Sequence, residues 1–133
     1  MTDRPKVRVT DVVAIAIPVE DQDEALAFYT GVLGCELVAD DVVGPGFRWV
    51  EVRPAGSAVG IALVAPEPDV PSGVDTGIRL TVEDAPAAHR ALQGAGAEVG
   101  ELLRWEGAPP MFAFSDPDGN RLYLVEQADV EQG

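Results

Sequence analysis

The chain has 133 residues, of which 47% are hydrophobic and 24% are charged; this length and balance fit one globular domain and exclude wholesale disorder or a fibrous repeat. Twenty-three acidic residues against nine Lys and Arg give a formal net charge of −14 at pH 7, which opposes binding to nucleic acid and to anionic membranes. We therefore expect no nucleic acid and no membrane among its partners.

Targeting signals and reactive side chains are scarce. No apolar run approaches the roughly 20 residues that a membrane-spanning helix needs, and the first residues lack a signal-peptide pattern, so the sequence predicts a cytoplasmic location. The single cysteine, Cys35, excludes an internal disulfide and a cysteine-based zinc site. It is either a small buried core residue or a reactive thiol. The lone His89 has no second His or Cys near it, which favours a packing or surface role.

The first half of the chain has the pattern β-α-β-β-β. A β-branched run over residues 12–17 predicts a buried strand. Asp21 is a suitable N-cap for a helix with apolar residues at helical spacing, and Gly34 ends that helix. Turn sequences rich in Gly and Pro then separate three predicted strands, over 36–39, 47–52 and 59–65.

The second half repeats this pattern after a Pro-rich linker over residues 66–75. A strand is predicted over 77–82, and the sequence Val-Glu-Asp of residues 19–21 recurs at 82–84, again before a helical pattern. The same order of strand, cap, helix, glycine and final strand in both halves indicates an internal duplication.

Two motifs in these halves are distinctive: Phe28-Tyr29 within the region 17–34, and Asp-Pro-Asp-Gly-Asn within the region 114–126. Together with the helix after 82–84, they resemble the vicinal oxygen chelate (VOC) superfamily, which contains glyoxalase I, extradiol dioxygenases, thiol-transferring fosfomycin resistance enzymes and bleomycin-binding proteins. The resemblance implies an α+β fold in which two βαβββ modules form a curled mixed sheet around a cleft, with the helices on the outer face. It also implies a homodimer, because modules of this type commonly pair.

The two modules define the expected domain organisation. We expect a single domain over 1–133, with module 1 over about 11–65, the linker over 66–75 and module 2 over about 76–127.

Enzymes of this superfamily hold a divalent metal with His, Gln or Glu side chains that project into the cleft from particular strand positions. Counted from the motifs, these positions are occupied here by Ala14, Ala62, Gly77 and Tyr123. Methyl groups and a hydrogen atom supply no ligand, and a phenol with a pKa of about 10 is a poor one. The resemblance therefore implies the family's fold without its metal, and we expect no cofactor.

Without a metal, aromatic and charged side chains are expected to bind a ligand in the cleft. Strand parity directs Arg79 into it, either to clamp a carboxylate or phosphate or stack on an aromatic ligand, or else to form an ion pair with a carboxylate such as Glu51. Trp49 is a pocket wall or a core residue, and Trp105 belongs to a lid or a subunit interface. The predicted ligand-binding residues are Trp49, Glu51, Arg79, Trp105, Met111 and Tyr123.

The sequence therefore predicts a metal-free protein that binds a small molecule, either a drug or a metabolite, and no catalytic residue is assigned. Three alternatives stay open. One is a metal-dependent lyase, isomerase or dioxygenase of the same superfamily with displaced ligands such as Glu51 and Glu126. Another is a proton-transfer enzyme that uses Tyr123 or Glu51. The third is a regulatory or scaffolding dimer without a ligand.

Overall fold

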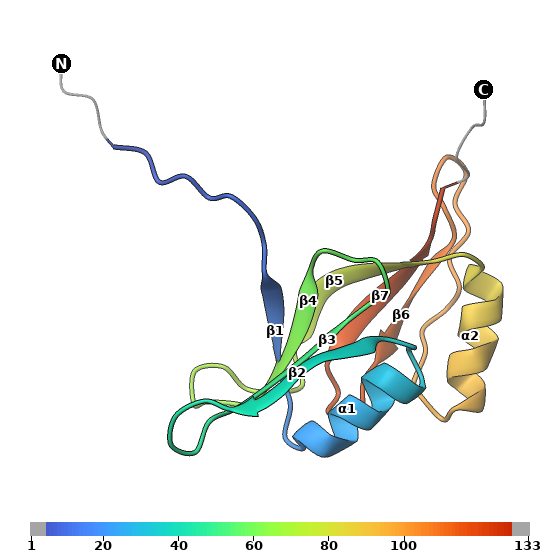
Figure 1. Ribbon diagram of the computed structural model, residues 1–133. Coiled ribbons are helices and arrows are strands. Elements are labelled where there is room, and N and C mark those ends of the chain that lie inside the picture. Colours follow the sequence, from blue (N-terminus) through green and yellow to red (C-terminus); the bar gives the residue numbers. More distant parts are fainter. Residues whose placement is uncertain (1–4, 129–133) are drawn as a thin grey trace.

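The structure is a computed structural model that describes residues 5–128. Its helices and strands follow the chain as β1 (Ala14–Pro18), α1 (Gln22–Gly31), β2 (Glu36–Val42), β3 (Arg48–Arg53), β4 (Gly60–Val64), β5 (Asp75–Val82), α2 (Ala85–Gly94), β6 (Met111–Ser115) and β7 (Arg121–Glu126). The predicted α+β class is confirmed (Figure 1). Within the described residues, neither helix is long and apolar enough to cross a membrane.

The strands form two mixed sheets, one from each half of the chain (Figure 1). The first sheet has the order β1-β4-β3-β2 and the second has the order β5-β7-β6. In each half the first strand runs parallel to the last strand, and the remaining neighbours are antiparallel. This shared connectivity confirms the two predicted modules, each of which forms a mixed sheet of its own.

Several strand boundaries differ from the predicted ones. β1 begins at Ala14 because its neighbour β4 begins at Gly60, the register partner of Ala14. β2 extends to Val42, which pairs with Arg48 across the hairpin. In the second sheet, the segment corresponding to β2 makes only isolated bridges, from Val99 to Phe114 and from Leu103 to Met111.

Both helices begin at the predicted caps. The Asp21 carboxylate accepts a hydrogen bond from the Glu24 N–H at 3.0 Å, and the Asp84 carboxylate accepts one from the Ala87 N–H at 3.0 Å. Each cap satisfies a backbone donor that the first helical turn leaves free. Gly34, with a φ of 75°, follows α1 and turns the chain toward β2.

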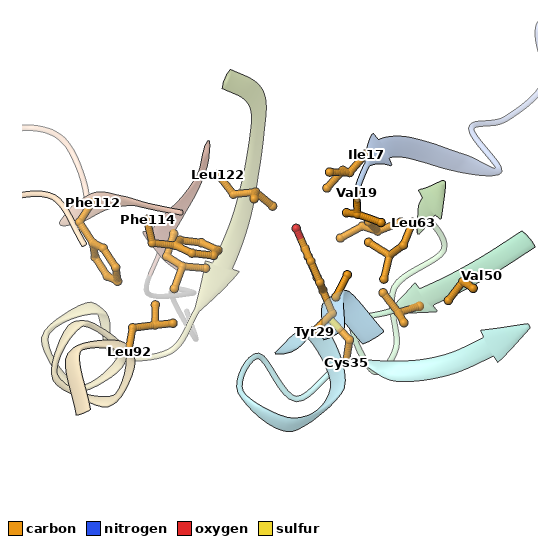
Figure 2. Packing of buried hydrophobic residues seen from close by; sticks show 14 residues of the cluster. Ile17, Val19, Tyr29, Cys35, Val50, Leu63, Leu92, Phe112, Phe114 and Leu122 are labelled. Carbon is orange, nitrogen blue, oxygen red and sulfur yellow. The ribbon is translucent and has the colours of Figure 1, made fainter. Parts of the chain in front are cut away.

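Each helix covers one face of the sheet from its own half. The largest buried side chains on those strands are Ile17, Val50, Leu63, Phe112, Phe114 and Leu122. Figure 2 shows them in two groups, with Tyr29 between the groups. Because side chains alternate along a strand, the residues next to these face away from the helices.

Cys35 and His89 both have packing roles. Cys35 is buried, and burial raises the pKa of its thiol, which favours the core interpretation over a reactive thiolate. The His89 ring packs edge-on against Phe112 with 4.8 Å between ring centroids, and its Nε2 lies 2.8 Å from the Gly100 carbonyl oxygen.

A buried polar network joins the two halves. Asn120 is fully buried; its Nδ2 donates to the Pro18 carbonyl at 2.8 Å, and its Oδ1 accepts from the N–H groups of residues 73–74. The Asp116 carboxylate accepts from the Tyr29 hydroxyl at 2.9 Å and from the Asn120 N–H. The Asp-Pro-Asp-Gly-Asn motif therefore connects β1, α1 and the segment before β5.

Candidate functional site

The face of the first sheet that is turned away from α1 holds a buried carboxylate. Register places Ala16, Ala62 and Glu51 in one row across β1, β4 and β3, and Trp49 shares this face. Trp49 Nε1 donates to Glu51 Oε1 at 3.1 Å. The predicted association of an indole with a carboxylate is therefore present.

Glu51 is only 6% exposed because its neighbours enclose it. A Cβ atom at Gly60 would lie 2.9 Å from the Glu51 Cδ, so the space for the carboxylate depends on this glycine. An Arg53 guanidinium nitrogen lies 3.7 Å from Glu51 Oε2, while the Arg53 Nε is buried and has no hydrogen-bond partner among the described residues. This cluster retains unused hydrogen-bonding capacity.

A second polar cluster lies on the corresponding face of the second sheet. Arg79 and Tyr123 are register partners on β5 and β7, and the Arg79 Cζ lies 4.3 Å from the centre of the Tyr123 ring. This distance is within the range of a cation–π contact. The Arg121 Cζ lies 5.5 Å from the same ring.

Asp75 fixes the tyrosine of this cluster. The Tyr123 hydroxyl donates to Asp75 Oδ2 at 2.7 Å. This hydrogen bond raises the pKa of Tyr123 and lowers the pKa of Asp75, so the pair is held as a neutral phenol and a carboxylate. A phenol in this state is a still poorer metal ligand than an isolated tyrosine.

The alternative ion pair between Arg79 and Glu51 does not form. Among residues 5–128, Arg79 makes no ion pair, and the cation near Glu51 is Arg53. Arg79 donates from Nη1 to the Gly77 carbonyl at 2.8 Å. Because the Arg79 side chain is exposed, its other N–H groups are accessible to a ligand.

Two cavities adjoin the Arg79–Tyr123 pair. One, of about 250 Å³, lies over β6 and β7 and is lined by Tyr123 together with Met111 and Arg121. The other, of about 520 Å³, lies between the turn over residues 54–57 and β5, where Arg79 lines it. The second cavity therefore has walls from both halves of the chain.

The predicted ligand-binding residues separate into three places. Arg79, Met111 and Tyr123 lie at these cavities, whereas Trp49 and Glu51 line neither of them. Trp105 is 62% exposed in the loop before β6 and also lines neither cavity.

The residues at the family's metal positions do not fit a divalent metal. Ala14 and Ala62 offer only methyl groups, and Gly77 has no side chain. Glu51 and Glu126, the alternative metal ligands, are not brought together either. The Glu126 carboxylate instead accepts a hydrogen bond from the Ala85 N–H at 3.0 Å, at the start of α2. Among residues 5–128, no group of three or more His, Cys, Asp or Glu is placed to hold a metal ion.

Three charged residues of these clusters were missed by the sequence analysis. Arg121 shares parity with Tyr123, and Arg53 shares parity with Glu51, so a complete count along each strand would have found both. Asp75 was assigned to the linker, where no periodic pattern marked it. It reaches Tyr123 because β5 begins at Asp75 and its pairing with β7 is irregular before Arg79.

Known proteins are similar to this chain in sequence and in fold. The uncharacterized protein YetH of Bacillus subtilis (strain 168) is 30% identical over 115 residues, covering 84% of this chain and 94% of YetH. The crystal structure of TnmS3, an antibiotic binding protein from Streptomyces sp. CB03234, matches with a TM-score of 0.81 and 31% identity, covering 92% of this chain and 100% of TnmS3.

A second solved structure is a member of the glyoxalase/bleomycin resistance protein/dioxygenase superfamily from Sphaerobacter thermophilus DSM 20745. It matches with a TM-score of 0.82 and 35% identity, covering 90% of this chain and 98% of that protein. The model of the Glyoxalase/Bleomycin resistance protein/Dioxygenase superfamily itself matches residues 11–124. The protein described here is thus a member of that superfamily.

Proposed function

We propose that this protein binds a small organic molecule, a drug or a metabolite, at the Arg79–Tyr123 pair and without a metal. The main support is the exposed Arg79 guanidinium, which stacks 4.3 Å above the Tyr123 ring beside two cavities. A planar guanidinium binds a carboxylate through two parallel hydrogen bonds and also stacks on aromatic rings. The hydrogen bond from Tyr123 to Asp75 holds the ring in place before a ligand arrives, which lowers the entropic cost of binding.

The proposal includes a homodimer in the cytoplasm. The cavity over β6 and β7, at about 250 Å³, is smaller than the roughly 300–1,000 Å³ of typical small-molecule pockets. A second copy placed over this face would enclose a larger volume. The likeness to TnmS3, described as an antibiotic binding protein, supports a ligand of drug size.

Arg79→Ala tests the proposed site. We use 2-naphthoate as the probe, because it combines a carboxylate with a planar aromatic ring. The native chain is expected to bind it, and Arg79→Ala is expected to weaken binding roughly 10- to 100-fold, since hydrogen bonds between charged groups contribute about 1.5–3 kcal/mol. Isothermal titration calorimetry measures both dissociation constants.

Two controls accompany this measurement. Arg90→Ala removes an exposed arginine of α2 and should leave binding unchanged. The uncharged analogue 2-naphthylmethanol should bind the native chain and Arg79→Ala equally weakly. Equal affinity of the native chain and Arg79→Ala for 2-naphthoate would place the ligand elsewhere.

Metal addition tests the proposal that the protein works without a metal. The four positions that hold the metal in this family present methyl groups, a hydrogen atom and a phenol already hydrogen-bonded to Asp75. Excess Mg²⁺, Mn²⁺, Fe²⁺, Ni²⁺ or Zn²⁺ is therefore expected to leave the Tm unchanged. Mass spectrometry of the tag-free protein should find no stoichiometric metal. A Tm that rises with the concentration of one metal would instead support an enzyme with displaced ligands.

A further inference from the structure

A further cavity lies at the junction of the two halves of the chain, where α2 faces the segment that follows α1. Its volume is about 250 Å³, and its walls come from this segment, α2, β5 and β7. Figure 2 shows two of the lining residues, Cys35 in one buried group and Leu92 in the other. Among residues 5–128, the side chains that line this cavity (the Cys35 cavity) are apolar apart from the Cys35 thiol and the Thr81 hydroxyl. Since an apolar cavity of about 150 Å³ holds a benzene molecule, this one has room for a larger apolar group.

The Cys35 cavity adjoins the cavity of about 520 Å³ that Arg79 lines (the Arg79 cavity). Pro54 and residues 80–82 of β5 line both cavities. β5 ends its sheet and pairs only with β7 among the described residues, so no ladder of hydrogen bonds closes its other edge. A ligand that follows this free edge reaches from one cavity into the other without breaking a strand pair.

The two cavities differ in polarity. The Arg79 cavity is lined by both charged and polar side chains, among them Arg79, Glu83 and Gln127. The Cys35 cavity is apolar, and an apolar wall gains free energy when an apolar group displaces water from it. Arg79 and Val82 are three residues apart on β5, which is about 10 Å along the strand. A molecule with a charged end and an apolar chain of about this length matches both cavities.

We propose that the ligand is an amphipathic carboxylate whose carboxylate binds Arg79 and whose apolar chain lies in the Cys35 cavity. This inference rests on the function proposed above and names the class of ligand. Glu83 lines the Arg79 cavity as well, so a second anionic group on the ligand would meet a like charge. A single carboxylate with an uncharged apolar chain therefore fits best.

A series of straight-chain carboxylates tests the proposal by isothermal titration calorimetry. Butanoate, hexanoate, octanoate and decanoate share one head group and differ in apolar length. For the native chain, affinity is expected to rise by up to roughly fourfold per methylene and at least roughly tenfold from hexanoate to decanoate, because the added methylenes enter the Cys35 cavity. Arg79→Ala should weaken the binding of all four by a similar factor and leave this rise unchanged.

Ala88→Leu/Ala91→Leu fills the Cys35 cavity from α2. Leucine is a strong helix former, so the double variant is expected to fold. Its rise in affinity from hexanoate to decanoate should fall below about threefold, because few methylenes are then buried, while its affinity for 2-naphthoate should equal that of the native chain. Arg90→Leu/Gln93→Leu adds the same two side chains at exposed positions of α2 that line neither cavity, and it should keep the full rise.

The Cys35 thiol measures the contact without any substitution, because it is the single cysteine of the chain. Alkylation by iodoacetamide is followed by mass spectrometry, with butanoate or decanoate present at the same multiple of its own dissociation constant. Equal multiples stabilise the folded state equally, so a difference in rate reports how far the ligand covers the thiol. Decanoate is expected to slow alkylation several-fold more than butanoate does.

The outcomes separate this inference from the proposed function. Affinities that do not depend on chain length, with Arg79→Ala still weakening 2-naphthoate, would overturn the amphipathic ligand and leave the Arg79 site. A full rise in Ala88→Leu/Ala91→Leu, or equal alkylation rates with butanoate and decanoate, would place the chain outside the Cys35 cavity and overturn the inference as well. A native chain that binds neither 2-naphthoate nor any of the four carboxylates would overturn both.

Discussion

Replacement of Asn120 by alanine is expected to lower the free energy of unfolding by about 3–4 kcal/mol. The side chain is fully buried, and its loss removes a hydrogen bond from the Pro18 carbonyl, from the N–H groups of residues 73–74 and from the Asp116 carboxylate. A buried polar group left unpaired costs about 1–3 kcal/mol. The total stays at about 3–4 kcal/mol because water reaches the exposed Gly73 and because Asp116 keeps the Tyr29 hydroxyl as a donor. The corresponding fall in Tm is about 10–15 °C.

Urea denaturation of Asn120→Ala and the native chain measures this difference. Gln93→Ala, which removes an exposed amide from α2, is the control and should change stability by less than about 0.5 kcal/mol. A loss below about 1 kcal/mol for Asn120→Ala would mean that water replaces the amide at all of its partners. Asn120 also joins β1 to the segment before β5, so the variant is expected to weaken 2-naphthoate binding even where it remains folded.

Much of the fold was predictable because it depends on local signals. Asp21 and Asp84 cap helices from the positions that their sequence context indicated, and Gly34 turns the chain after the first helix. Strand periodicity also identified the face that carries Trp49 and Glu51. These features follow from backbone geometry within a few residues, which a single sequence contains.

The contacts at the candidate site were less predictable because they depend on tertiary placement. Parity correctly turned Arg79 and Tyr123 to one face, but it does not state that they stack or that Asp75 accepts a hydrogen bond from the phenol. Likewise, Glu51 and Arg79 lie on separate sheets, so no count along one strand predicts whether they meet. The sequence identified residue types and faces, and the strand pairing and side-chain packing within each half determined which residues meet.

The buried network also makes the free energy of unfolding fall at alkaline pH. Burial, with Asp116 beside the hydroxyl, raises the pKa of Tyr29 far above its value of about 10 in the unfolded chain. Above pH 10 the unfolded state therefore releases this proton while the folded state keeps it. The contribution of Tyr29 is complete below pH 10 and falls by up to about 1.4 kcal/mol per pH unit above it.

Tyr29→Phe is expected to separate the hydrogen bond from the titration. At pH 7 the variant should be about 1.5–3 kcal/mol less stable than the native chain, because the Asp116 carboxylate loses a donor. Phenylalanine has no proton to release, so the difference should shrink between pH 10 and pH 12. Urea denaturation across this range measures it, with Tyr123→Phe as the control. Tyr123 is only half-buried and donates to the exposed Asp75, so this variant should have a smaller effect at pH 7. An unchanged difference at pH 12 would mean that Tyr29 ionises in the folded state, and hence that its hydroxyl reaches solvent while the two halves of the chain remain joined.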